Sequence, residues 1–188
     1  MKLIALRCPT CSEPLAVEND DVVVACGHCQ EMVAIAQNGP VKMAVRFAVA
    51  DGRQPPGNQW VPFWVFNGRA VIVRRETQGG GGSAEKESRR LWESPRALYV
   101  PAWEIAMNTA QSIGSRLIEQ QPNFQPIERP EGVQLVSATV TPGDARKLLE
   151  FIVLAIEARR KDWLKNLVFN LEVGEPQMMA LPQKMFGS

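Results

Sequence analysis

The sequence predicts an α+β protein in two parts: a small cysteine-containing module over residues 1–39, and an α+β domain over residues 40–188 with a mostly antiparallel sheet and two main helices. Three observations support this. All four cysteines lie among the first 29 residues, in two closely spaced pairs. Several later runs are rich in the β-branched and aromatic residues of strands. Two other segments carry apolar residues at helical spacing.

The composition is typical of a globular protein, since 45% of the residues are hydrophobic, 22% are charged and the formal net charge is +1. No apolar run approaches the roughly 18 residues that a membrane-spanning helix needs. Residues 3–6 are too few for the apolar core of a signal peptide. We therefore expect a soluble, cytoplasmic protein.

The cysteines form two Cys-x2-Cys pairs with fourteen residues between them. Each pair directs two sulfurs to one point, and two pairs supply the four soft ligands of a tetrahedral zinc site. Residues 15–17 and 22–25 are expected to form a hairpin, and residues 32–36 to add a strand. In these features about the first 37 residues resemble the zinc-ribbon family, a tetracysteine, rubredoxin-like fold. The resemblance implies a structural Zn²⁺ held by Cys8, Cys11, Cys26 and Cys29.

Other chemistries use cysteine pairs. Disulfides and a thioredoxin-type redox pair are disfavoured, because nothing indicates export and no strand–helix–strand unit surrounds either pair. A rubredoxin-like iron site stays open, although residues 1–39 contain none of the aromatic residues with which that family surrounds its iron. Four cysteines close the coordination shell, so we expect a structural ion and no catalytic one. His28, the only histidine, is interpreted as an exposed turn residue.

Charge disfavours nucleic-acid binding by this module. Residues 1–39 hold three more acidic than basic side chains and no aromatic side chain on which bases could stack. Residues 40–83 instead hold four more basic than acidic side chains. A nucleic-acid-associated factor that uses this second region is the alternative function, with the candidate residues Arg46, Arg53, Arg69, Arg74 and Arg75.

The first half of the larger domain is expected to be mainly β. Residues 42–50 alternate as a strand. Asn67-Gly68, the preferred dipeptide of a two-residue type I′ turn, predicts a hairpin between residues 60–66 and 69–75. Residues 78–84 contain a run of glycines and predict a flexible loop. A short charged helix is expected over residues 84–93.

Apolar spacing then predicts a helix over residues 101–120, followed by an extended linker to residue 132 and a strand over 133–140. Thr141 and the proline after it predict the N-terminus of a second helix.

This second helix is expected to end near residue 161, where three basic residues, 159–161, suit the negative end of the helix dipole. Two strands, residues 164–173 and 177–181, complete the domain.

No phosphate-binding loop and no nucleophile elbow occurs in the sequence, so we expect a non-enzymatic protein. Glu104 and Glu150 are the acids whose surroundings are worth inspecting. The arrangement of the remainder weakly resembles uncharacterised bacterial proteins that join a zinc ribbon to an α+β domain, and this implies no activity. An enzyme with an unrecognised site in the α+β domain is the third, least favoured class.

Two groups of apolar side chains are candidates for binding a protein partner. They lie in the predicted hairpin and in the C-terminal tail: Trp60, Phe63, Trp64, Phe66, Met178, Met179, Met185 and Phe186. Packing into the protein's own core is the alternative interpretation. We expect a zinc-binding adaptor, assembly factor or accessory subunit of a larger protein complex.

Overall fold

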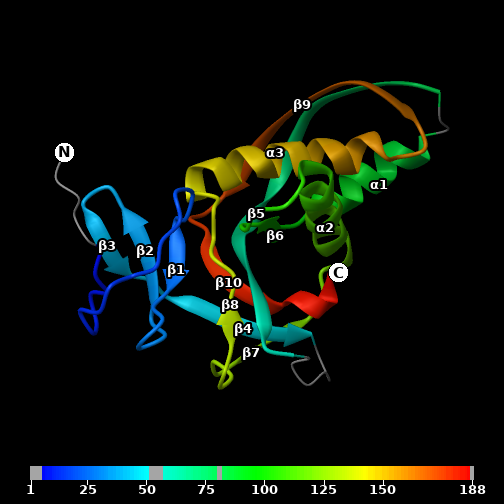
Figure 1. The fold of residues 1–188 in the computed structure, drawn as a ribbon. Coiled ribbons are helices and arrows are strands. Elements are labelled where there is room, and N and C mark those ends of the chain that lie inside the picture. The colour runs from blue at the N-terminus through cyan, green and yellow to red at the C-terminus, as the bar shows by residue number, and fades with distance from the viewer. Residues whose placement is uncertain (1–5, 51–56, 80–81, 187–188) are drawn as a thin grey trace.

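The computed structural model describes residues 6–50, 57–79 and 82–186 (Figure 1). In chain order its elements are β1 (Val23–Ala25), β2 (Met32–Ala36), β3 (Gly39–Lys42), β4 (Val45–Ala50), β5 (Gln59–Gln78), α1 (Ser83–Trp92), β6 (Arg96–Pro101), α2 (Met107–Gln120), β7 (Phe124–Ile127), β8 (Gln134–Leu135), α3 (Pro142–Ala158), β9 (Trp163–Val173), β10 (Gln177–Pro182) and the 3₁₀ helix η1 (Gln183–Met185). None of the described helices is long and apolar enough to cross a membrane.

The strands form two sheets, which confirms the predicted α+β class. The small sheet is antiparallel, in the order β1-β2-β3. The large sheet runs β6-β5-β10-β4-β7, and β8 and β9 also pair with β5. All its pairings are antiparallel except β10 with β4 and β5 with β8. Figure 1 shows α3 running between the small sheet on one side and the long β5–β9 pair on the other.

The strand β5 shows that the predicted hairpin is wrong. It continues for 20 residues straight through Asn67-Gly68. Its first half pairs with β10 and β6, and its second half pairs with β9. Gly68 serves a close approach of two backbones: a Cβ there would collide with the carbonyl oxygen of Glu172 and lie 2.8 Å from the Cα of Val173. A glycine needed for such an approach cannot be told from a turn glycine by local sequence alone.

The C-terminal strand predicted over residues 177–181 is confirmed. Residues 177–182 form β10, which lies between β5 and β4 in the large sheet. Met178 and Leu181 are 1% and 0% exposed, respectively. The tail is therefore a central strand, because its main-chain groups complete the hydrogen bonding of two neighbours.

Several element boundaries differ from the prediction. The strand predicted over residues 42–50 begins only at Val45, as β4, and residues 39–42 form β3, which pairs with β2 in the small sheet. The predicted helix from residue 101 begins only at Met107, because residues 96–101 pair with β5 as β6. The predicted linker after Gln120 contains β7, which pairs with β4. In the last two cases a pairing distant in sequence overrides the local pattern.

Other predictions are confirmed. Helix α1 falls on the predicted charged segment, and β9 on the predicted strand over 164–173. Helix α3 begins as expected: the Asp144 N–H donates to Thr141 Oγ1 at 3.1 Å, and Pro142 is the first helical residue. The predicted flexible loop over residues 78–84 overlaps the end of β5 at Gln78 and the start of α1 at Ser83. Its residues 80–81 lie outside the described ranges.

The small sheet shares a hydrophobic core with the large one. Val23 and Met32 are buried in the same cluster as Trp64 and Ile156. Main-chain bonds join the two parts as well, because the N–H of Ala138 donates to Val23 O at 2.8 Å. Unfolding of the small sheet would therefore remove side chains from the main core.

The close approach at Gly68 gives a first testable prediction. Gly68→Ala places a Cβ against the backbone of β9 and is expected to lower the free energy of unfolding by about 1–3 kcal/mol. The matched control is Gly143→Ala in the first turn of α3, where a new Cβ meets only Thr141 Oγ1 at 3.9 Å. This control is expected to raise stability by about 0.5–1 kcal/mol through helix propensity. Urea unfolding measures both, and equal effects of the two variants would contradict the assignment.

Candidate metal centre

The four cysteine sulfurs converge on one point, as the sequence predicted. The Sγ atoms of Cys8 and Cys29 are 3.6 Å apart, as are those of Cys11 and Cys26. All four sulfurs lie within 4.8 Å of one another, and no disulfide joins them. Residues 15–17 do not form the predicted strand, and the first loop instead has an isolated antiparallel bridge between Arg7 and Pro14.

Each cysteine pair lies in a loop of the same construction, with the sequence Cys-x-x-Cys-x-Glu. In the first loop the N–H of Cys8 donates to Glu13 O at 2.9 Å. In the second the N–H of Cys26 donates to Glu31 O, also at 2.9 Å. The two loops therefore present their sulfurs in equivalent ways, which favours four equivalent ligands around one centre.

The residue after each second cysteine has a left-handed backbone. Ser12 has φ 63° and Gln30 has φ 61°, a conformation that non-glycine residues seldom adopt. Each closes its loop by donating its N–H to the carbonyl of the first cysteine, Cys8 or Cys26, at 2.9 Å. Repetition of this strained conformation in both loops indicates that ligand geometry, rather than chance, fixes it.

The chemistry and spacing of the sulfurs fit zinc. Zn–S bonds of about 2.3 Å place the corners of a regular tetrahedron about 3.8 Å apart. The two 3.6 Å separations between sulfurs are close to this value. Cys8 and Cys26 are buried, Cys11 is half-buried and Cys29 is exposed, so the centre lies at the edge of the small sheet. The exposed His28 is not part of the ligand group.

The surroundings of the sulfurs give them unequal proton affinities. Burial raises the pKa of the Cys8 thiol, but N–H groups of Cys11 and Thr10 donate to its sulfur and lower that pKa to about 6. For Cys29, the N–H of Glu31 lowers the pKa, whereas partial desolvation of its sulfur and the other three sulfurs raise it to about 12. Zinc binds thiolates, so binding releases protons, and the affinity falls as the pH falls.

The residues predicted to bind a partner lie elsewhere and are mostly in the core. In β5 the exposed fractions of Trp60, Phe63, Trp64 and Phe66 are 3% or less. Met178 is buried in β10, and Met179, Met185 and Phe186 are half-buried. The Phe63 ring packs on Phe186, with ring centroids 5.1 Å apart. The sheet needs the five buried side chains for its own packing, so their assignment to a partner surface is corrected to core packing. For the half-buried Met179, Met185 and Phe186 a partner contact stays a prediction.

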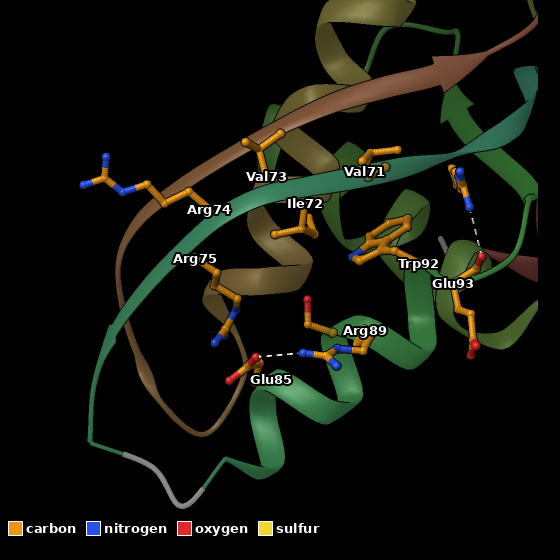
Figure 2. A pocket seen from close by; sticks show the side chains of 12 residues that line it. Val71, Ile72, Val73, Arg74, Arg75, Glu85, Arg89, Trp92 and Glu93 are labelled. Carbon is orange, nitrogen blue, oxygen red and sulfur yellow. Dashed lines mark hydrogen bonds and ion pairs between the residues drawn. The ribbon is translucent and has the colours of Figure 1, made fainter.

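Three arginines of the alternative, nucleic-acid function, Arg69, Arg74 and Arg75, line one groove beside α1 (Figure 2), but each is paired with a carboxylate of this chain. Arg75 is only 7% exposed at its side chain and is bound to two carboxylates. Arg69 pairs with Glu172 on β9, and Arg46 lies on the separate strand β4. Arg53 lies outside the described residues.

The sequence did not reveal a buried ionic network beneath α1. Glu157 is 0% exposed and accepts hydrogen bonds from Arg75, Arg160 and the indole of Trp92, each at 3.0 Å. Arg75 also forms a bidentate pair with Asp162. Burial raises the pKa of Glu157, but the bonds from Arg160 and Trp92 outweigh it and lower this pKa.

This network corrects two expectations from the sequence. The basic residues 159–161 follow the last turn of α3, and Arg160 binds Glu157 in place of complementing the helix dipole. Glu104 and Glu150, the acids chosen for inspection, are both exposed. The burial of Glu157 could have been predicted from its spacing, because it lies four residues after the apolar Val153 and therefore on the same, inner side of α3.

No known protein family matches this chain, and comparison with curated proteins and with solved structures finds no significant match. A function therefore has to be inferred from the chain's own geometry.

The left-handed residues of the two loops give a second prediction. Ser12→Gly is expected to stabilise the zinc-loaded protein by up to about 1 kcal/mol, because glycine adopts this φ without a steric penalty. Ser12→Val is expected to destabilise it, since a β-branched residue fits this region worst. The Ser12 side chain is exposed, and Arg7 binds its main-chain oxygen, so both variants keep that bond. Urea unfolding in excess zinc distinguishes them; a Gly variant less stable than the Val variant would contradict the strain assignment.

The buried network gives a third prediction. Glu157→Gln leaves Arg160 without a buried counter-charge and is expected to lower the free energy of unfolding by about 3 kcal/mol. Glu150→Gln, the same change at an exposed position of α3, is expected to stay within about 0.5 kcal/mol of the parent. Tryptophan fluorescence during urea unfolding measures both, because Trp92 contacts Glu157 directly. Small effects in both variants would show that the network contributes little.

Proposed function

We propose that this chain is a zinc-stabilised, non-enzymatic protein that binds another protein chain, as an adaptor, assembly factor or accessory subunit. One observation carries the proposal: four cysteine sulfurs within 4.8 Å of one another offer a complete, closed ligand set, held by two loops of the same construction. Four thiolates saturate tetrahedral zinc, so the ion has a folding role.

The placement of the small sheet supports this folding role. Strands β1 and β2 connect the cysteine loops to the main core through Val23 and Met32. A metal that holds the loops therefore also stabilises the packing of α3 and β5 around these side chains. The zinc ribbon is, in this proposal, an integral part of the domain.

Exposed apolar side chains support the protein-binding role. Among the described residues, seven large apolar side chains are exposed, and three of them lie on β5 and β9: Val73, Trp163 and Val168. Two more, Phe151 and Leu154, lie one turn apart on α3. Exposed apolar groups that gather on neighbouring elements are typical of protein contact areas.

The folding role predicts a response far from the metal. Metal analysis is expected to find one zinc per chain, and removal of zinc by a chelator under reducing conditions is expected to change tryptophan fluorescence. Residues 1–39 contain no tryptophan, so such a change reports on the larger domain, whose tryptophans include Trp64 and Trp92 of the shared core. Cys26→Ser is expected to reproduce the change, and His28→Ala, at an exposed position beside a ligand, is expected to behave as the parent. A protein that stays metal-free with unchanged fluorescence would refute the folding role.

The protein-binding role is tested separately. The full chain with an affinity tag, expressed in its native host, is expected to co-purify with a partner chain in fixed proportion, and Cys26→Ser is expected to lose it. Elution as a single species with no stoichiometric partner, at native expression, would refute this part of the proposal.

A further inference from the structure

Each cysteine loop has an arginine on the carbonyl oxygen of its left-handed residue. In the first loop the guanidinium of Arg7 donates to Ser12 O at 2.9 Å. In the second loop Arg129 donates to Gln30 O in the same way, and its other terminal nitrogen donates to Gln30 Oε1 at 3.2 Å. The two carbonyls occupy equivalent places, because each belongs to the residue that follows the second cysteine of its pair. The loops therefore share an arginine contact as well as their main-chain bonds.

The two arginines come from different parts of the chain. Arg7 directly precedes the first cysteine of its own loop, whereas Arg129 is 99 residues away from Gln30 and follows β7. The position of the second loop that matches Arg7 is Ala25. Ala25 ends β1 and packs against the main core, where a guanidinium would lose its water without gaining a partner. The second loop therefore takes its guanidinium from a distant segment.

Arg129 is held in position on the side away from the loop. Its guanidinium carbon lies over the Phe47 ring, 5.5 Å from the ring centroid, and Phe47 is only 5% exposed. A cation is attracted to the face of an aromatic ring, more strongly where water is excluded. The main chain is restrained as well, because Ile127 pairs with Phe47 and Pro130 confines the residue before it to extended conformations. The arginine is therefore preorganised for its contact with Gln30.

The guanidinium of Arg129 is not neutralised by an acid of this chain. Within the described residues it forms no ion pair, and both of its terminal nitrogens bond to Gln30. Glu31, the acid next to Gln30, is bound by Lys42 at 2.8 Å. The Gln30 side chain donates in turn to Gly27 O at 3.1 Å, between the two cysteines of the pair. Arg129 thus acts on the loop both directly and through the Gln30 amide.

We propose that Arg129 is a positioning residue of the metal centre: its guanidinium holds the second cysteine loop in ligand geometry, as Arg7 holds the first. Replacement of residues that hold metal ligands in place typically lowers metal affinity about 10–100-fold. Because Arg129 is anchored beside β4 and β7, zinc binding is coupled to the β7 edge of the large sheet. This inference rests on the proposed folding role of zinc, because it names a residue through which the larger domain acts on the ligands.

The first test compares the zinc affinities of full-length variants by competition with a chromophoric chelator under reducing conditions. Arg129→Ala is expected to bind zinc about tenfold more weakly than the parent, because it removes both bonds to Gln30. Arg129→Lys keeps the charge but lacks the fork that reaches two acceptors, so its affinity is expected to lie between those of the parent and Arg129→Ala.

A second arginine supplies the matched control. Arg46 and Arg129 line the same groove beside Phe47, but Arg46 is exposed and makes no bond to either cysteine loop in the described part of the chain. Arg46→Ala removes the same charge from this groove and is expected to keep the parent's zinc affinity within about twofold.

A further measurement separates positioning from a general loss of stability. The zinc-loaded proteins are treated briefly with N-ethylmaleimide, and mass spectrometry of a glutamate-specific digest assigns the first thiols modified. Arg129→Ala is expected to raise modification of the second cysteine pair relative to the first by about threefold or more, because only the second loop is released. Arg7→Ala is expected to shift the proportion toward the first pair. General destabilisation would expose both pairs alike and leave the parent's proportion unchanged.

Two results would overturn the assignment: equal zinc affinities of Arg129→Ala and Arg46→Ala, or an unchanged proportion of the two cysteine pairs in Arg129→Ala. If either occurs while the parent still binds zinc and responds to its removal, the folding role stands and only the role of Arg129 is lost. A parent that takes up no zinc refutes the folding role and this assignment together.

Discussion

The long strand β5 pairs in turn with β8, β10, β6 and β9, so the large sheet depends on its remaining extended over all 20 residues. Gly68 sits where the partners change, and the absence of a side chain there lets the backbone of β9 come close enough to continue the pairing. The close approach of the β5 and β9 backbones at Gly68 therefore determines how the large sheet continues past β6. The bond from Gly174 N–H to Asn67 O, at 3.1 Å, marks the same junction from the other side.

The cysteine loops and the main core stabilise each other. The loops position their sulfurs through main-chain bonds and two left-handed residues, a geometry that is local to each loop. The strands beside them place Val23 and Met32 against α3 and β5. Because free energy from metal binding is free energy of folding in such sites, its effect extends to side chains that are not near the ion. The cysteine loops also have a small hydrophobic cluster of their own, in which Val24 and Val33 pack with Cys8 and Cys26.

The two-stranded region formed by β5 and β9 combines rigidity with an exposed edge. Exposed edges risk aggregation, and proteins usually protect them with charge or with a covering element. Here three arginines and the nearby helix α1 supply both forms of protection. The buried bonds between Arg75, Glu157 and Trp92 hold α1 in place, since a lone buried charge in that position would be costly.

The sequence by itself determined those features whose geometry depends on a few neighbouring residues. The Cys-x2-Cys pairs and the Thr141-Pro142 helix start depend on main-chain bonds within single turns, so their residues signal them directly. Only the tertiary structure decided the role of Gly68, the central place of β10 in the large sheet and the burial of Glu157. A glycine for close approach resembles a turn glycine, a central strand resembles an edge strand, and a buried acid resembles a solvated one. In each case the deciding partner comes from a distant part of the chain: β9 for Gly68, β4 and β5 for the C-terminal strand, and Arg75 for Glu157.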